Sequence, residues 1–443
     1  MPRKNITAGY GVGATFDQTF KETFDQGIQA QHHQWLPLLS WLKDSNQVKT
    51  VKHEGKFFTF LTEMHPGSNS GAVGEDGTLP TSDNPSQVQA SVDYQRSLKG
   101  QFEITAESIE WAKGDKGTFK DSMKSSMESL KTQIMRLAGP GLWGDGTGRL
   151  AACAVSLQNG TSLTLSASET FNSCYPGSRW VHHGQRLGIL SSAGTGVGVS
   201  LGASAGDLAS TTRISRIPAD TAVILSAASS VNTNDVIFNI GDLSANTSVG
   251  YNYAGPDGML AAVDARFRGT YLNIDSDTYD LWKGIESHNS GTARPQTTTL
   301  FYQNYFKVGR WVGDIKHSPV AWSNPDVYTD LLRLMEPNVQ YQPTKLEMGF
   351  KPLTLMINGV GIPIRLDYYC PKYWFMLQPK SLYFINSRPL GLVTDRDGNA
   401  WERIANKTNF NAMFWWGLNT YTKHRNNHGI IKDLDVTIFS QGL

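Results

Sequence analysis

Apolar and polar residues alternate strictly along one segment near residue 100. Its apolar positions are Leu98, Gly100, Phe102 and Ile104, with charged or polar residues between them. A period of two places successive side chains on opposite faces of the chain, so the pattern predicts a half-buried β-strand. We extend this predicted strand over residues 89–105 and predict a second strand over residues 48–61, which together form a two-stranded arm.

The segment between the two predicted strands, residues 65–85, consists mainly of Gly, Ser, Asn, Asp and Pro and has almost nothing to bury. Strands of about fourteen residues reach roughly 45 Å, which is longer than an ordinary hairpin. A hairpin of that length is unstable alone and leaves unpaired edges. We therefore predict that residues 48–105 lie across another copy of the chain, with contacts made by Phe58, Phe60, Leu98 and Phe102.

A single amphipathic helix is predicted directly after the arm, over residues 117–138. Its apolar residues recur at steps of three and four and form one stripe, which consists of Phe119, Met123, Met127, Leu130, Ile134 and Leu137. We expect this stripe to pack against a β-sheet of the same subunit. Gly139 and Pro140 follow, a combination that predicts the end of the helix.

The first 47 residues form an N-terminal arm rich in aromatic residues. Phe16, Phe20 and Phe24 are spaced by four and predict a short helical stripe. A dense apolar cluster over residues 35–42 follows and includes Trp35 and Trp41. Two interpretations remain open for this cluster: a helix on the core of its own subunit, or an arm clamped on a neighbour through Trp35 and Trp41.

The rest of the chain is predicted to consist mainly of β-strands, with one further helix. A small antiparallel β module is predicted over residues 179–249, where short β-like runs are joined by Ser, Gly, Ala and Asn. A short helix is predicted over residues 325–335. Further strands are predicted at 353–357, 362–368, 373–378, 381–385, 410–418 and 430–439.

Composition narrows the function classes. The chain has 443 residues and a formal net charge of +1, so it lacks the basic surplus typical of proteins that neutralise nucleic-acid phosphates. Three widely spaced cysteines argue against a disulfide framework and for a reducing compartment. No apolar run approaches the length of about 18 residues that a membrane span needs, so we expect no membrane partner.

No set of residues with the spacing of a catalytic, cofactor or metal site stands out. Residues 139–144 match Gly-x-Gly-x-x-Gly, but a dinucleotide loop follows a strand and opens a helix, whereas this one follows a helix and contains Pro140. His32-His33 and His182-His183 are adjacent pairs, whose side chains diverge. Asp367 lies at a predicted strand end, where a buried hydrogen-bonding role is expected. We therefore predict that the chain is not an enzyme.

The order of these elements resembles the major capsid proteins of tailed double-stranded DNA bacteriophages, which have the Hong Kong 97-type fold. Residues 100–105 are similar to the return strand of that family's extended loop, and residues 119–138 to its spine helix. Residues 142–150 resemble the turn after the spine helix. Residues 257–264 and 355–364, followed by Asp367, resemble strands and hairpins of its peripheral and axial domains.

The resemblance implies an α+β fold divided along the chain. The expected parts are an N-terminal arm (1–47), the extended loop (48–105), a peripheral domain with the spine helix (106–178), an inserted β module (179–249), the rest of the peripheral domain (250–300), an axial domain (301–419) and a C-terminal return strand (420–443).

The resemblance also implies a function and partners. The chain is expected to self-assemble as hexamers and pentamers into an icosahedral head in the virion, after assembly in the host cytoplasm. Portal and scaffolding proteins are expected partners, decoration proteins are possible ones, and packaged double-stranded DNA is contacted non-specifically. Two alternatives stay open: an encapsulin-like compartment shell, because encapsulins share the fold, and a carbohydrate-binding surface protein, because the chain has 12 tryptophans.

Overall fold

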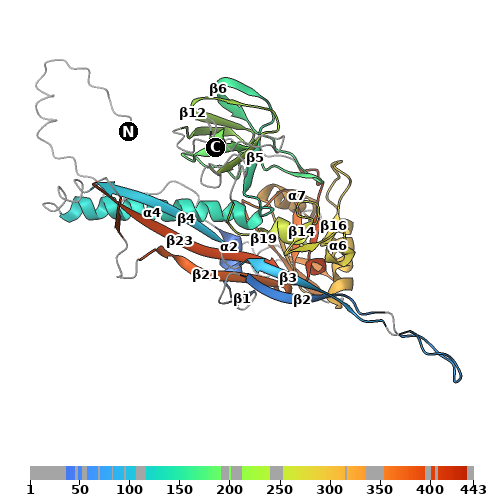
Figure 1. The fold of residues 1–443 in the computed structure, drawn as a ribbon. Helices are drawn as coiled ribbons and strands as arrows, with labels where there is room; N and C mark the ends of the chain where they lie inside the picture. Colours follow the sequence, from blue (N-terminus) through green and yellow to red (C-terminus); the bar gives the residue numbers. More distant parts are fainter. Residues whose placement is uncertain are drawn as a thin grey trace, which may run out of the picture.

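The structure is a computed structural model, shown in Figure 1. It describes residues 36–44, 48–51, 57–67, 70–81, 83–93, 96–105, 116–190, 199–200, 212–239, 253–314, 317–335, 354–394, 401–404 and 408–436. The predicted helical stripe of Phe16, Phe20 and Phe24, and Trp35, lie outside the described residues.

A five-stranded sheet joins the beginning and the end of the chain. Its strands run in the order β1 (Lys49–Val51), β21 (Leu382–Leu392), β23 (Asn409–Thr422) and β22 (Glu402–Arg403), and β4 (Ser97–Thr105) also pairs with β23. The antiparallel register of β4 and β23 runs from Ser97 opposite Gly417 to Thr105 opposite Asn409. The prediction that residues 97–105 belong to the arm is therefore wrong, because this strand has a partner in its own subunit.

The arm itself is shorter than predicted. Strand β2 (Phe57–His65) pairs with β3 (Ser86–Asp93), and Figure 1 shows the connection between them projecting from the body of the subunit. Strand β1, which was expected to continue into the arm, pairs in parallel with β21 instead.

Helix α4 (Lys116–Trp143) runs alongside β4 and β23 (Figure 1). The predicted end before Gly139 is wrong, because the helix continues through Pro140 to Trp143. Leu142 and Trp143 are fully buried, and their burial outweighs the hydrogen bond that Pro140 cannot donate. Gly139 packs against the ring of Tyr369, where a Cβ would lie 2.6 Å from a ring carbon.

A six-stranded mixed sheet forms a second body with two helices. Its order is β16 (Ile285–Ser287), β24 (Gly429–Ile431), β20 (Trp374–Leu377), β17 (Val320–Ser323), β19 (Val360–Leu366) and β18 (Thr354–Ile357). Helix α7 (Pro325–Met335) has the predicted bounds. Helix α6 (Thr298–Val312) was not predicted, although Phe301, Tyr305 and Val308 recur at helical spacing and form its buried face.

The inserted β module begins earlier than residue 179. One sheet has the order β10 (Val199–Ser200), β9 (Leu187–Leu190), β13 (Val236–Asn239) and β5 (Arg149–Ala152). The other has the order β11 (Ile214–Ala219), β12 (Ala222–Val231) and β6 (Leu157–Thr164). Strands β5 and β6 follow α4 directly and pair with the later strands of the module, so the expected boundary at 179 is wrong.

The remaining described elements are short. They are α2 (Pro37–Lys43), β7 (Glu169–Thr170), β8 (Ser173–Cys174), α5 (Met259–Val263), β14 (Thr270–Tyr271), β15 (Ile274–Asp275) and the 3₁₀ turns η2 (Asp280–Trp282), η4 (Pro379–Ser381) and η5 (Arg425–Asn427). All five side chains of α5 are buried between the larger bodies.

The expected axial segment 301–419 also differs from the observed grouping. Strands β21 and β23 pair with β1 and β4 beside α4, whereas β24 joins the six-stranded sheet. The groups of strands that pair in the folded chain therefore do not coincide with the domains predicted along the sequence.

Candidate assembly surfaces

The base of the arm is held by its own subunit. Phe58 and Phe60 are half-buried on the inner face of β2, and each ring centroid lies 6.2 Å from that of Tyr421. The ammonium group of Lys423 lies 5.8 Å and 5.3 Å from the same two phenylalanine rings, within the range of a cation–π contact. The inner face of β2 thus fixes the direction of the arm, and Phe58 and Phe60 are used within the subunit.

The outer face of β2 carries the exposed apolar residues. Phe57 and Leu61 are 55% and 68% exposed, and they alternate with the inward-facing positions. Exposed apolar side chains grouped on one face of a projecting strand are typical of an interaction surface. The alternation of the sequence contained this signal, but the sequence alone did not indicate which of the two faces was the outer one.

The tip of the arm is exposed along its whole described length, residues 70–81 and 83–85. It includes the exposed apolar residues Val73 and Leu79. Its described charged residues, Glu75, Asp76 and Asp83, are all acidic. The tip therefore presents a polar, negatively charged surface with two apolar points of contact.

Leu98 and Phe102 do not belong to this surface. Leu98 is buried in the main core of the subunit, and Phe102 packs against that core from β4. The ring of Phe102 meets Trp401 edge-on at 5.3 Å and lies 6.4 Å from Phe414. The predicted role of Leu98 as a contact between copies is wrong, because its side chain is buried within the subunit. Phe102 is only partly buried, and its contact with another copy stays a prediction.

Trp41 is also a core residue. Its side chain is fully buried, and its ring centroid lies 5.4 Å from that of Trp322. The backbone N–H of Leu38, at the start of α2, donates to Asp367 at 3.2 Å. Residues 37–43 therefore pack on their own subunit, the first of the two interpretations, and the prediction that Trp41 clamps a neighbour is wrong.

Asp367 has the buried hydrogen-bonding role expected of it. Besides Leu38, its carboxylate accepts the backbone N–H of Tyr369 at 2.9 Å. Burial raises the pKa of Asp367 to about 6, although these hydrogen bonds oppose the shift. The side chain ties α2 to the end of β19 and has no geometry that points to catalysis.

The stripe of α4 meets β4 at a glycine. Ile134 is 1% exposed and Leu130 is buried beside it. A Cβ on Gly100 would lie 2.7 Å from Cδ1 of Leu130, so the missing side chain lets the helix approach the strand closely. Met127 is half-buried against the same core. The side chains of Phe119 and Met123 lie outside the described residues.

A second apolar surface lies on α6 and was missed by the sequence reasoning. The side chain of Thr297 caps the start of the helix by accepting the N–H of Leu300, and Gly313 follows the last turn in the left-handed conformation. The face away from its core carries three exposed aromatic residues, which are Tyr302, Phe306 and Trp311. Spacing alone would have revealed this helix, but not that its outer face is aromatic.

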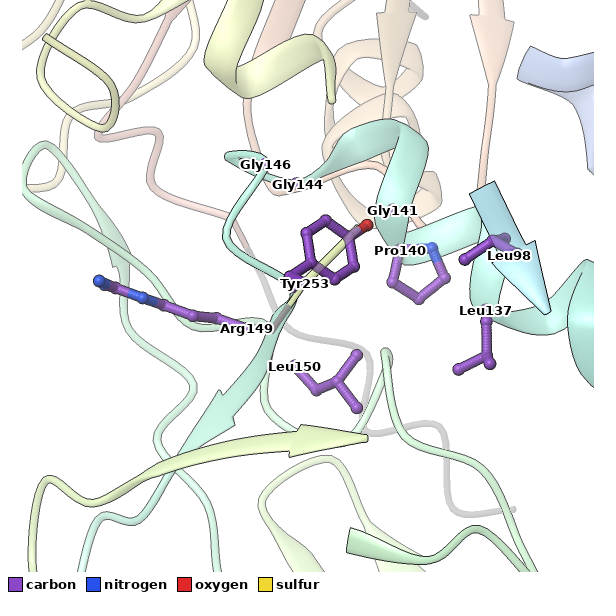
Figure 2. A pocket seen from close by; sticks show the side chains of 10 residues that line it. Leu98, Leu137, Pro140, Gly141, Gly144, Gly146, Arg149, Leu150 and Tyr253 are labelled. Atoms are coloured by element: carbon purple, nitrogen blue, oxygen red, sulfur yellow. The ribbon is translucent and has the colours of Figure 1, made fainter. Parts of the chain in front are cut away.

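The glycine-rich motif at the C-terminal end of α4, residues 139–144, lines a water-sized cavity. Figure 2 shows this cavity between the C-terminal turn of α4 and Tyr253, and its volume is about 20 Å³. Pro140, Gly141 and Gly144 lie on its wall.

The part of the chain that the structure describes contains no cluster of three His, Cys, Asp or Glu residues placed to bind a metal ion. Within the same residues, no helix has the length and apolarity to cross a membrane. Among the described tryptophans seven are buried, namely Trp41, Trp143, Trp180, Trp282, Trp322, Trp374 and Trp416. They serve packing and are not available for stacking on sugars.

Comparison with known proteins identifies solved structures with a similar fold. No protein-family model matches the sequence, and no curated protein matches it. Among solved structures, the chain is similar to the capsid asymmetric unit of cyanophage A-1(L), with a TM-score of 0.58 and 12% identity over 96% of this chain and 99% of that one. It is also similar to the capsid of the native GTA particle, with a TM-score of 0.50 and 8% identity over 97% of this chain and 100% of that one.

These similarities extend over nearly the whole length of both chains. The expected α+β capsid fold of the Hong Kong 97 type is therefore confirmed. At these low identities the similarity establishes the fold, and function requires a separate argument.

Proposed function

We propose that this chain is a major capsid protein that self-assembles into the icosahedral head enclosing the double-stranded DNA of a tailed phage. The observation that carries the proposal is a capsid fold over the full length combined with a projecting arm that exposes Phe57 and Leu61 on its outer face. A shell subunit replaces contacts with water by contacts with its neighbours, and an arm that has exposed apolar side chains and is anchored at its base suits this role.

The proposed partners follow from this role. Copies of the chain form hexamers and pentamers, and portal, scaffolding and decoration proteins bind the shell they build. Assembly takes place in the host cytoplasm, and the mature shell belongs to the virion. Packaged DNA is contacted non-specifically, which fits a formal net charge of +1. No described feature favours the encapsulin-like or carbohydrate-binding alternative.

The test of the proposal is electron microscopy of the purified chain, alone and with the products of neighbouring genes. Closed icosahedral shells are expected, and a chain that stays monomeric under every condition would contradict the proposal. Replacing residues 66–85 by a short turn removes the tip and keeps Met64, which is buried at the base of the arm. This variant should fold as the wild type does and assemble poorly.

Among the proposed partners, the need for a scaffolding protein is the easiest to test. Residues 1–47 are aromatic and show no heptad pattern, so they do not resemble a coiled-coil scaffold. Shells of aberrant size from the chain alone, corrected by a second gene product, are expected. Uniform shells of virion size from the chain alone would refute the need for a scaffold.

A further inference from the structure

Three charged side chains meet in the interior, away from the assembly surfaces. Lys432 follows β24, Asp264 ends α5 and Glu286 lies in β16. Lys432 and Asp264 are both 0% exposed and form an ion pair, and Glu286 Oε2 lies 3.4 Å from Nζ of the same lysine. One buried amine thus touches two carboxyl groups.

Backbone contacts hold the three residues in place. Strand β16 pairs in parallel with β24, and the N–H of Lys432 donates to the carbonyl of Ser287 at 2.9 Å. The N–H of Asp264 donates to the carbonyl of Leu260 at 2.9 Å, and Oδ1 of Asp264 accepts the N–H of Arg266 at 2.9 Å. The three side chains therefore approach each other from fixed positions, which is the condition for an efficient intramolecular reaction.

Two aromatic rings flank the lysine, whose Nζ also donates to the carbonyl of Phe171 at 3.4 Å. Its Nζ lies 5.7 Å from the ring of Phe171 and 5.1 Å from the ring of Phe267. Burial of separated charges in such a place is costly. Burial also raises the pKa of Asp264 to about 7, despite the opposing charge of Lys432.

We propose that Lys432 and Asp264 join in an intramolecular amide bond, with Glu286 as the proton carrier. The lysine amine attacks Cγ of Asp264, and Glu286 takes a proton from the attacking nitrogen. Glu286 then gives that proton to the hydroxyl that leaves Cγ, so the products are one amide and one water molecule. No oxidant or other reagent is consumed. The bond would tie the last strand of the six-stranded sheet to α5, and it goes beyond the proposed function because it lies within a single chain.

The intact mass of the denatured full-length protein tests this proposal. The expected mass is one water molecule below that of the sequence, and a digest should contain a branched peptide that joins Asp264 to Lys432. Lys372 and Asp326 provide an internal control, because their ion pair at 3.5 Å is partly exposed and should remain unlinked in the same digest. A wild-type chain of sequence mass without a branched peptide would overturn the proposal.

Two variants separate the roles of the residues. Glu286→Gln keeps the shape of the side chain and removes the proton carrier, so the full sequence mass is expected from a folded protein. Lys432→Met removes the amine and should also give the sequence mass. Loss of water in Glu286→Gln to the extent seen in the wild type would refute the role of Glu286, and a branched peptide that maps to other residues would refute the assignment of the bond.

Discussion

Replacing Phe57 and Leu61 by serine tests the division of the arm into an inner and an outer face. Full burial of a phenylalanine or leucine side chain stabilises by about 1.5–3 kcal/mol. Because these two residues are 55% and 68% exposed, covering them in the shell should contribute about 1–2 kcal/mol each. Loss of about 3 kcal/mol per contact would weaken association of each pair of copies on the order of 100-fold.

The assay compares assembly with the stability of the isolated subunit. The double variant should need a much higher protein concentration to form shells, as measured by light scattering and electron microscopy, with an unchanged melting temperature of the subunit. Met64→Ser is the matched control, since Met64 lies on the inner face of the same strand and is buried. This control should lower the melting temperature. Normal assembly of the Phe57→Ser, Leu61→Ser variant would refute the assignment of the outer face to a neighbouring copy.

Three further predictions concern the subunit itself. Ile134→Ala should lower the free energy of unfolding in urea by about 2–4 kcal/mol, because it leaves a cavity between α4 and β4. Gln133→Ala, at an exposed position of the same helix, should change it by less than about 0.5 kcal/mol. Equal effects of the two variants would contradict the packing described. Gly258→Ala should lower the melting temperature sharply, because its Cβ would lie 2.1 Å from the carbonyl oxygen of Gly144. Gly74→Ala is the control and should leave the melting temperature unchanged, because no atom lies within 4 Å of its added Cβ. Similar melting curves of the two variants would contradict the close approach at Gly258. Burial raises the pKa of Asp367 to about 6, so the native state binds this proton more tightly than the unfolded state, and the free energy of unfolding should decrease as pH rises from about 4 to about 6. In Asp367→Asn, the free energy of unfolding, measured from denaturation curves at several pH values, should depend less on pH in this range. An unchanged pH dependence would contradict the raised pKa of Asp367.

Local patterns predicted individual elements well. The alternation of apolar and polar residues predicted strand β4, and apolar residues spaced by three and four predicted helix α4. Helix α7 was predicted with its observed bounds. Each of these signals lies within a few turns or a single strand, where the sequence determines which side chains share a face. The order of the elements then indicated the capsid fold that the solved structures support.

Features that depend on distant residues were not predictable in this way. Strand β4 carries the same alternation whether it pairs with an arm strand or with β23, and only the folded chain decides between them. Pro140 is a strong stop signal, yet the burial of Trp143 carries α4 past it. The approach of Lys432 to Asp264 and Glu286 joins three distant segments, and none of them has a local pattern that signals it.

The sheet that anchors the arm has a consequence for the timing of synthesis. Strands β1 and β4 leave the ribosome early, but their partners β21 and β23 lie near the C-terminus. Pairings of such high sequence separation form only after most of the chain is available. A nascent chain that lacks β23 therefore has no base on which to hold its arm, and in the proposed shell only subunits translated past β23 are expected to join their neighbours.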